Sequence, residues 1–183
     1  MFGEGSFNAA FVPSYSKELV KGKRKSENFA NNIFNLLTIF LLALVLLVEL
    51  FMPVFVSLIA PGFKSNPEKF ALATQLTKIT FPFILFVSLA SFFSAILNSH
   101  NRFAAASAAP IILNLVMIGI LVFGKILGEK LVIFLSYGVS IAGFIQAFFL
   151  VIFVKRFFEP KLKFNFNISK NVKLFFKKLL PSI

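Results

Sequence analysis

The chain contains no cysteine, so neither a disulfide nor a thiolate metal site can form within it. It has a single histidine, His100, which lacks the neighbouring ligands that a histidine-based metal or catalytic site needs. We therefore predict no metal and no cofactor. We also predict no catalytic residue, so the protein is not expected to be an enzyme.

Acidic residues are scarce: seven Asp and Glu stand against 19 Lys and Arg, which gives a net charge of +12. Such an excess in a soluble protein would suggest a nucleic-acid partner. Here 58% of the residues are hydrophobic and the mean hydropathy is +0.88, which leaves little for a soluble surface. We therefore expect no nucleic-acid partner and interpret the basic residues in the context of a membrane.

Charge is also absent from four long apolar runs, at residues 33–48, 79–97, 103–124 and 131–154. A helix needs roughly 20 apolar residues to cross a ~30 Å hydrocarbon core. The first run is shorter than this, but the apolar sequence continues after Glu49, so this helix can also span the core. Backbone groups in lipid must pair within each segment, which favours helices, and the runs lack the alternation of barrel strands. The sequence predicts an all-α polytopic membrane helix bundle. Its four full transmembrane helices span about residues 29–59, 72–98, 103–125 and 130–156, with partial helices flanking them.

The basic residues divide unequally between the two sets of connectors. Five lie in or around the first-to-second and third-to-fourth connectors: Lys64, Lys69, Lys78, Lys125 and Lys130. Fourteen lie in the others: Lys17, Lys21, Lys23, Arg24, Lys25, Arg102, Lys155, Arg156, Lys161, Lys163, Lys170, Lys173, Lys177 and Lys178. By the positive-inside rule, the N-terminal end and the C-terminal connector are cytoplasmic.

Residues that begin, end or bend helices mark the predicted spans. Ser26 and Asn28 are candidate N-caps of the first span, and Pro61-Gly62 closes the hairpin that follows it. Pro82 and Pro110 lie inside spans, where a proline either is tolerated or marks a helix that bends during transport.

The connector between the third and fourth spans is short, and Gly124 lies near the end of the third. These two helices are therefore predicted to be antiparallel neighbours. Small residues at 104–109 would let the third span approach another helix closely.

Residues 161–183 differ from the rest of the chain. Strict alternation at 161–168 is followed by apolar residues at helical spacing opposite Lys170, Lys173 and Lys177. This pattern is typical of a basic amphipathic helix in an anionic headgroup region. A second interpretation, which we favour, is a connector that leads into a further span.

Several motifs carry a specific resemblance. The run Glu-Gly-Ser-Phe-Asn-Ala-Ala-Phe-Val-Pro at 4–13 resembles the motif that ends the second helix of the MurJ (MviN) lipid II flippases. Ala60-Pro61-Gly62-Phe63 resembles that family's first outer turn, and Thr80-Phe81-Pro82-Phe83 the start of its fourth helix. Residues 97–103, Leu-Asn-Ser-His-Asn-Arg-Phe, resemble its inner turn, and Ala109-Pro110 with Leu113-Asn114 also matches. Order and spacing fit along nearly the whole chain.

The resemblance implies membership of the MOP exporter superfamily and a transporter of about 14 helices in two lobes. Such a transporter moves the lipid-linked peptidoglycan precursor from the inner to the outer leaflet of the bacterial inner membrane by alternating access. Residues 1–160 would be part of the N-terminal lobe, with the third to sixth helices, and 161–183 the connector. The implied partners are membrane lipid, the precursor and the remainder of the transporter, and we expect this chain alone not to transport.

Five residues are candidates for substrate binding: Glu4, Asn98, Asn101, Arg102 and Asn114. Glu4 either pairs with a cation in the cavity or caps a helix at the inner surface. At the inner turn, Arg102 either binds phosphate through its guanidinium or anchors the topology. The amide of Asn114 within a span should bond to another helix or line the cavity.

Two alternative functions remain at this stage. One is a related exporter of the MOP superfamily that carries drugs or polysaccharide lipids. The other is a membrane scaffold without transport, which predicts no inward cavity.

Overall fold

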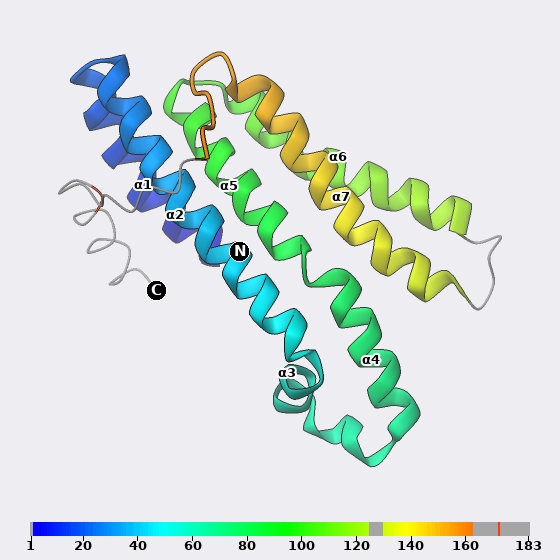
Figure 1. Ribbon diagram of the computed structural model, residues 1–183. Helices are drawn as coiled ribbons and strands as arrows, with labels where there is room; N and C mark the ends of the chain where they lie inside the picture. The colour runs from blue at the N-terminus through cyan, green and yellow to red at the C-terminus, as the bar shows by residue number, and fades with distance from the viewer. Residues whose placement is uncertain (1, 125–129, 163–171, 173–183) are drawn as a thin grey trace.

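The computed structural model describes residues 2–124, 130–162 and 172, with the side chains described from Phe7 onward. All regular elements in this part of the chain are helical (Figure 1). They are α1 (Phe2–Val20), α2 (Lys23–Leu50), α3 (Met52–Ile59), the 3-10 helix η1 (Pro61–Ser65), α4 (Pro67–Thr80), α5 (Phe83–Ser99), α6 (Phe103–Gly124) and α7 (Leu131–Val154). The all-α prediction is confirmed. Nearly all of the 161–183 connector lies outside the described residues.

Four helical segments in the described ranges are long and apolar enough to cross a membrane. They are Lys23–Leu50, Pro67–Ser99, Phe103–Gly124 and Leu131–Val154, which confirms the four predicted spans. The first differs in detail, because it starts at Lys23 and is interrupted at Phe51 before α3. Pro53 occupies the first turn of α3, where its missing N–H does no harm, and it could not continue α2.

The predicted N-caps Ser26 and Asn28 are wrong, because both lie inside α2. The chain turns earlier, at Gly22, whose φ of 115° is a backbone conformation that suits glycine. The Ser26 hydroxyl donates instead to the Lys23 carbonyl at 2.8 Å. Glycine, and not a capping side chain, therefore sets the start of this span.

The predicted outer hairpin is present, with Pro61 and Gly62 in η1 between α3 and α4. Asn66 then caps α4, since its Oδ1 accepts a hydrogen bond from the Lys69 backbone N–H at 3.1 Å. Pro67 follows at the first helical position, where its fixed φ suits a helix start.

The two prolines within the spans differ in effect. At Pro82 the helix is interrupted, so that α4 ends at Thr80 and α5 begins at Phe83. The Ser140 hydroxyl on α7 donates to the Ile79 carbonyl in the turn before this break, at 2.7 Å. Pro110, by contrast, lies within a continuous α6. A neighbouring helix thus supplies a donor where proline disturbs the backbone, as membrane helices require.

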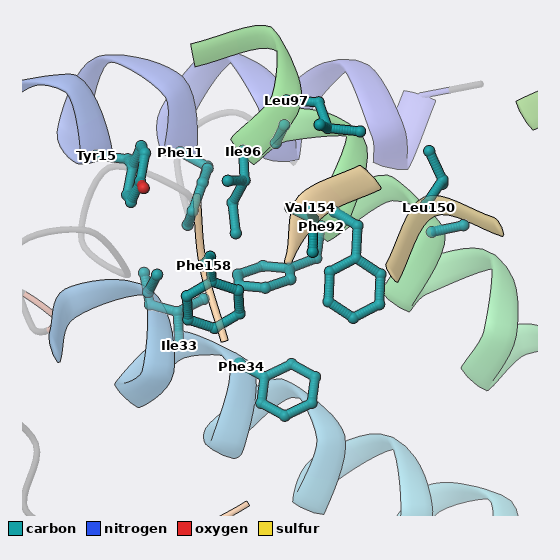
Figure 2. Close-up of a cluster of buried hydrophobic side chains, with 14 of the residues drawn as sticks. Phe11, Tyr15, Ile33, Phe34, Phe92, Ile96, Leu97, Leu150, Val154 and Phe158 are labelled. Carbon is teal, nitrogen blue, oxygen red and sulfur yellow. The ribbon is translucent and has the colours of Figure 1, made fainter. Parts of the chain in front are cut away.

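The core is rich in phenylalanine (Figure 2), and its buried residues come from α1, α2, α5, α6 and α7. Phe11 and Phe92 are fully buried and meet edge to face, with ring centroids 5.2 Å apart. Phe158, just after α7, reaches the same cluster and contacts Phe34 and Phe92. Burial of aromatic rings of this size contributes much of the packing energy between helices. These phenylalanines are therefore core residues.

Helix α5 lies at the centre and packs against α1, α2, α6 and α7, while α6 and α7 run side by side (Figure 1). This confirms the predicted pairing of the third and fourth spans, and α6 ends at Gly124 as expected. The α1–α2 junction, the α5–α6 turn and the end of α7 lie at one end of the bundle, which we call the basic end (Figure 1). It carries the described members of the larger basic group, including Arg24, Arg102 and Arg156.

Candidate functional site

A cavity of about 200 Å³ lies between α1, α5, α6 and α7, and we call it the polar cavity. Alanines and Pro110 form the apolar part of its wall. Its polar lining consists of Asn8, Ser91, Ser94, Asn98, Ser107 and Gln146. So many amides and hydroxyls between membrane-length helices mark this cavity as the candidate functional site.

Three of these side chains bury an oxygen that has no hydrogen-bond partner among the described residues. They are Asn8 Oδ1, Ser91 Oγ and Gln146 Oε1, which come from three different helices. Burying a polar group without a partner costs about 1–3 kcal/mol. The polar cavity therefore favours a hydrophilic ligand or solvent that donates hydrogen bonds into it.

The spacing of the lining residues explains how they reach one cavity. Ser91, Ser94 and Asn98 follow one another at intervals of three and four residues, so they share one face of α5. Asn8 approaches from α1 and Gln146 from α7. Sequence reasoning found only Asn98, although the serine spacing on α5 was a usable signal.

The structure separates the five predicted site residues. Among the four whose side chains the structure describes, only Asn98 lines the polar cavity. Glu4 lies in α1 one turn before Asn8, and its side chain lies outside the described part of the chain. Asn114 is exposed on α6 and is not part of the lining of the polar cavity, although it shares a helix face with Ser107 and Pro110. Asn101 and Arg102 lie in the turn between α5 and α6.

Asn101 has a clear structural role. Its φ is 57°, the left-handed region that asparagine tolerates better than most residues. The Asn101 N–H donates to the Asn98 carbonyl at 3.1 Å, and the Arg102 N–H donates to the Leu97 carbonyl at 2.8 Å. These two bonds form a Schellman motif that ends α5 and fixes the position of Arg102.

His100 joins three segments at the basic end. Its Nε2 lies 3.1 Å from the Tyr15 hydroxyl on α1, and its ring stacks on Phe157 with centroids 4.3 Å apart. The Arg102 guanidinium carbon lies 5.8 Å from the centre of the same Phe157 ring. Burial lowers the pKa of His100, which favours a neutral imidazole that accepts from Tyr15. His100 therefore links α1, through Tyr15, and the segment after α7, through Phe157, to the α5–α6 turn.

Comparison with known proteins gives consistent matches. The family model described as "Lipid II flippase MurJ" matches residues 1–183. The chain is 38% identical over 157 residues to a probable lipid II flippase MurJ of Rickettsia prowazekii (strain Madrid E), covering 85% of this chain and 31% of that protein. It is 40% identical over 151 residues to a probable lipid II flippase MurJ of Rhizobium tropici, covering 80% of this chain and 28% of the relative. The chain thus spans about a third of the length of the curated relatives it matches.

A solved structure shows the same arrangement of helices. It is described as "Lipid II flippase MurJ, inward closed conformation" and aligns with a TM-score of 0.76 at 29% identity. The alignment covers 99% of this chain and 37% of the other.

Proposed function

Because the chain belongs to the lipid II flippase MurJ family, we propose that its bundle is part of the N-terminal lobe of a flippase that moves lipid II across the bacterial inner membrane. The transport involves no covalent chemistry. The lipid-linked peptidoglycan precursor is the substrate, and the flippase carries it from the inner to the outer leaflet.

The observation that carries this proposal is the polar cavity. A lipid-linked precursor has a hydrophilic head, and moving that head through hydrocarbon requires polar groups at membrane depth. Asn8, Ser91 and Gln146 provide buried oxygens that lack protein donors in the described residues. Hydroxyl and amide groups of a sugar or peptide head can donate to them. A pure scaffold has no use for unpaired polar groups of this kind, so the cavity favours transport.

The candidate substrate-binding residues fall into three groups under this proposal. Asn98 contacts the head within the polar cavity, and Glu4 acts close to Asn8, one turn away on α1. Asn114 is exposed on α6 and would meet either lipid or another part of the transporter. Asn101 and Arg102 lie outside the polar cavity, at the basic end, so this proposal does not assign them to binding of the substrate head.

The test is Gln146→Leu in the gene that encodes this chain, expressed from its own locus. Leucine has a similar volume and removes an unpaired buried oxygen, so the protein should remain at least as stable. We expect the fraction of lipid II exposed at the outer leaflet to fall several-fold. The matched control is Gln75→Leu, because Gln75 is exposed on α4 outside the polar cavity.

Two outcomes would contradict the proposal at different levels. If Gln146→Leu translocates lipid II as well as the native protein, the polar cavity does not contact the substrate. If depletion of the native gene leaves the outer-leaflet exposure of lipid II unchanged in a strain without another flippase, the transport function itself is wrong.

A further inference from the structure

A second cavity, of about 470 Å³, lies at the basic end between the start of α6 and the end of α7. We call it the basic groove. Arg102 and Arg156 line its charged part, and Phe149 and Phe153 line its apolar part. The surface thus changes from cationic to apolar along one groove, as the surface of a phospholipid changes from phosphate to acyl chain.

Both arginines of the basic groove are available for an external anion. No Asp or Glu lines the groove in the part of the chain that the structure describes. The described carboxylates of the basic end pair with lysines: Glu18 with Lys21 at 2.6 Å, Glu27 with Lys23 at 3.8 Å and Glu159 with Lys161 at 3.4 Å. Guanidinium groups bind phosphate oxygens in a bidentate manner, so two of them in one groove suit a phosphate.

The basic groove faces away from the polar cavity. Ala104, Ala105 and Ala108 line the groove, whereas Ala106, Ser107, Ala109 and Pro110 line the polar cavity. On a helix of 3.6 residues per turn these two sets centre on roughly opposite faces of α6. A ligand in the groove is thus separated from the candidate substrate site by the α6 helix itself. This placement favours a lipid of the surrounding membrane over the transported substrate.

The arginine at the α5–α6 turn is held in place before any ligand binds. The Schellman bonds of the turn fix the Arg102 backbone, and its guanidinium lies over Phe157. Phe157 is in turn stacked on His100. A site organised in this way loses less conformational freedom on binding.

We propose that the basic groove binds one anionic glycerophospholipid from the leaflet that the basic end faces. Its phosphate lies between Arg102 and Arg156, and one acyl chain lies along Phe149 and Phe153 beside Ala104 and Ala108. The bound lipid links the start of α6 to the end of α7. This site is separate from substrate transport and does not depend on it.

The test measures lipid binding to the 183-residue chain in detergent by native mass spectrometry. Phosphatidylglycerol is titrated, and phosphatidylcholine is the neutral comparison. We expect Arg102→Gln combined with Arg156→Gln to weaken binding of phosphatidylglycerol about tenfold and to leave phosphatidylcholine unchanged. The matched control is Arg24→Gln with Lys25→Gln, which removes two exposed charges from the same end outside the groove. The control should change binding less than about twofold.

A second variant tests the shape of the groove without changing its charge. Ala104→Phe fills the apolar part at an exposed position, so it should fold normally and weaken phosphatidylglycerol binding about tenfold. Leu115→Phe, exposed elsewhere on α6, is its control. If the control variants lose phosphatidylglycerol binding as strongly as the groove variants do, binding is not specific to the groove and the proposal is overturned. The proposal is also overturned if the groove binds a polyprenyl diphosphate through both arginines but does not bind phosphatidylglycerol.

Discussion

Asn98 and Asn101 lie three residues apart at the end of α5, but they differ in backbone conformation and therefore in role. Asn98 is helical and places its amide in the polar cavity. Asn101 has a φ of 57° and lets α5 end and α6 begin within three residues. Of the two, only Asn98 lines the polar cavity.

Substitution of Asn101 tests this assignment. Asn101→Gly should change the free energy of unfolding by no more than a few tenths of a kcal/mol, since glycine adopts the left-handed region freely. Asn101→Val should destabilise the chain by about 1–2 kcal/mol, because a β-branched residue is strained there. Thermal unfolding in detergent, followed by circular dichroism, measures both. Equal stability of the two variants would show that the backbone at this position is not strained.

Because burial lowers the pKa of His100, we predict that the stability of the folded chain depends on pH. Burial lowers its pKa in the folded chain below the usual value of about 6.5, so the unfolded chain binds the proton more readily. Stability should be constant above about pH 6.5 and fall as the pH drops from there toward the lowered folded pKa. This window lies above the usual titration range of Asp and Glu. In His100→Gln, which does not titrate, the melting temperature should fall much less between pH 7.5 and 5.5. A native chain whose melting temperature is flat over this range would refute the role of His100.

At the residue scale the sequence was a partial guide to the site. Asn98 was predicted because it lies with Asn101 and Arg102 at the predicted inner turn. Asn8 and Gln146 were missed, since one amide in a helix does not reveal which other helices face it. The polar cavity exists only once α1, α5, α6 and α7 meet.

At the scale of single elements, the membrane helices tolerate breaks where a neighbour compensates for them. The α4–α5 break at Pro82 is an example, because Ser140 on α7 donates to the Ile79 carbonyl. Ser136, one turn earlier on α7, donates at 2.9 Å to Val132 in its own helix. The two serines provide a natural comparison between bonding across helices and bonding within one.

We expect Ser140→Ala to destabilise the chain by about 0.5–1.5 kcal/mol, since it removes a hydrogen bond between two membrane helices. Ser136→Ala should lower the free energy of unfolding by less than Ser140→Ala, because the Val132 carbonyl lies within a regular helix. Thermal unfolding of both variants under the same conditions measures the difference. If Ser136→Ala is the more damaging of the two, the bond to Ile79 does not support the break.

The four spans could be predicted because each is a long apolar run, and run length is a physical requirement of the bilayer. Pro53 indicated a bend in the first span, but the position of the break at Phe51 was not predicted. Pro53 lies two residues beyond the break, and Phe51 itself carries no helix-ending signal. The N-caps were wrong for a related reason, since a glycine with positive φ replaced the side-chain cap.

At the scale of the whole molecule, the unequal distribution of charge predicts an orientation in the membrane. The α1–α2 junction, the α5–α6 turn and the end of α7 lie together and carry the larger basic group (Figure 1). The opposite end includes η1 and the start of α4, with Lys64 and Lys69. The positive-inside rule therefore predicts a cytoplasmic basic end.

The absence of cysteine makes this orientation easy to test. Lys25→Cys and Lys64→Cys place one thiol at each end, both at exposed positions. In intact spheroplasts a membrane-impermeant maleimide should label Lys64→Cys, whereas Lys25→Cys should be labelled only after permeabilisation. The reverse pattern would mean that the larger basic group faces the periplasm and that the positive-inside assignment is wrong.

The last prediction at this scale is that this chain alone does not transport lipid II. Alternating access requires two halves that rock against each other around a central site. The chain spans about a third of the length of the curated relatives it matches, and we propose that its polar cavity is one wall of such a site. Vesicles that contain the 183-residue protein should therefore move labelled lipid II no faster than empty vesicles, while a full-length relative should move it faster. If the chain alone exceeds the empty vesicles, four spans suffice to build a path for the head, and the need for a second lobe must be abandoned.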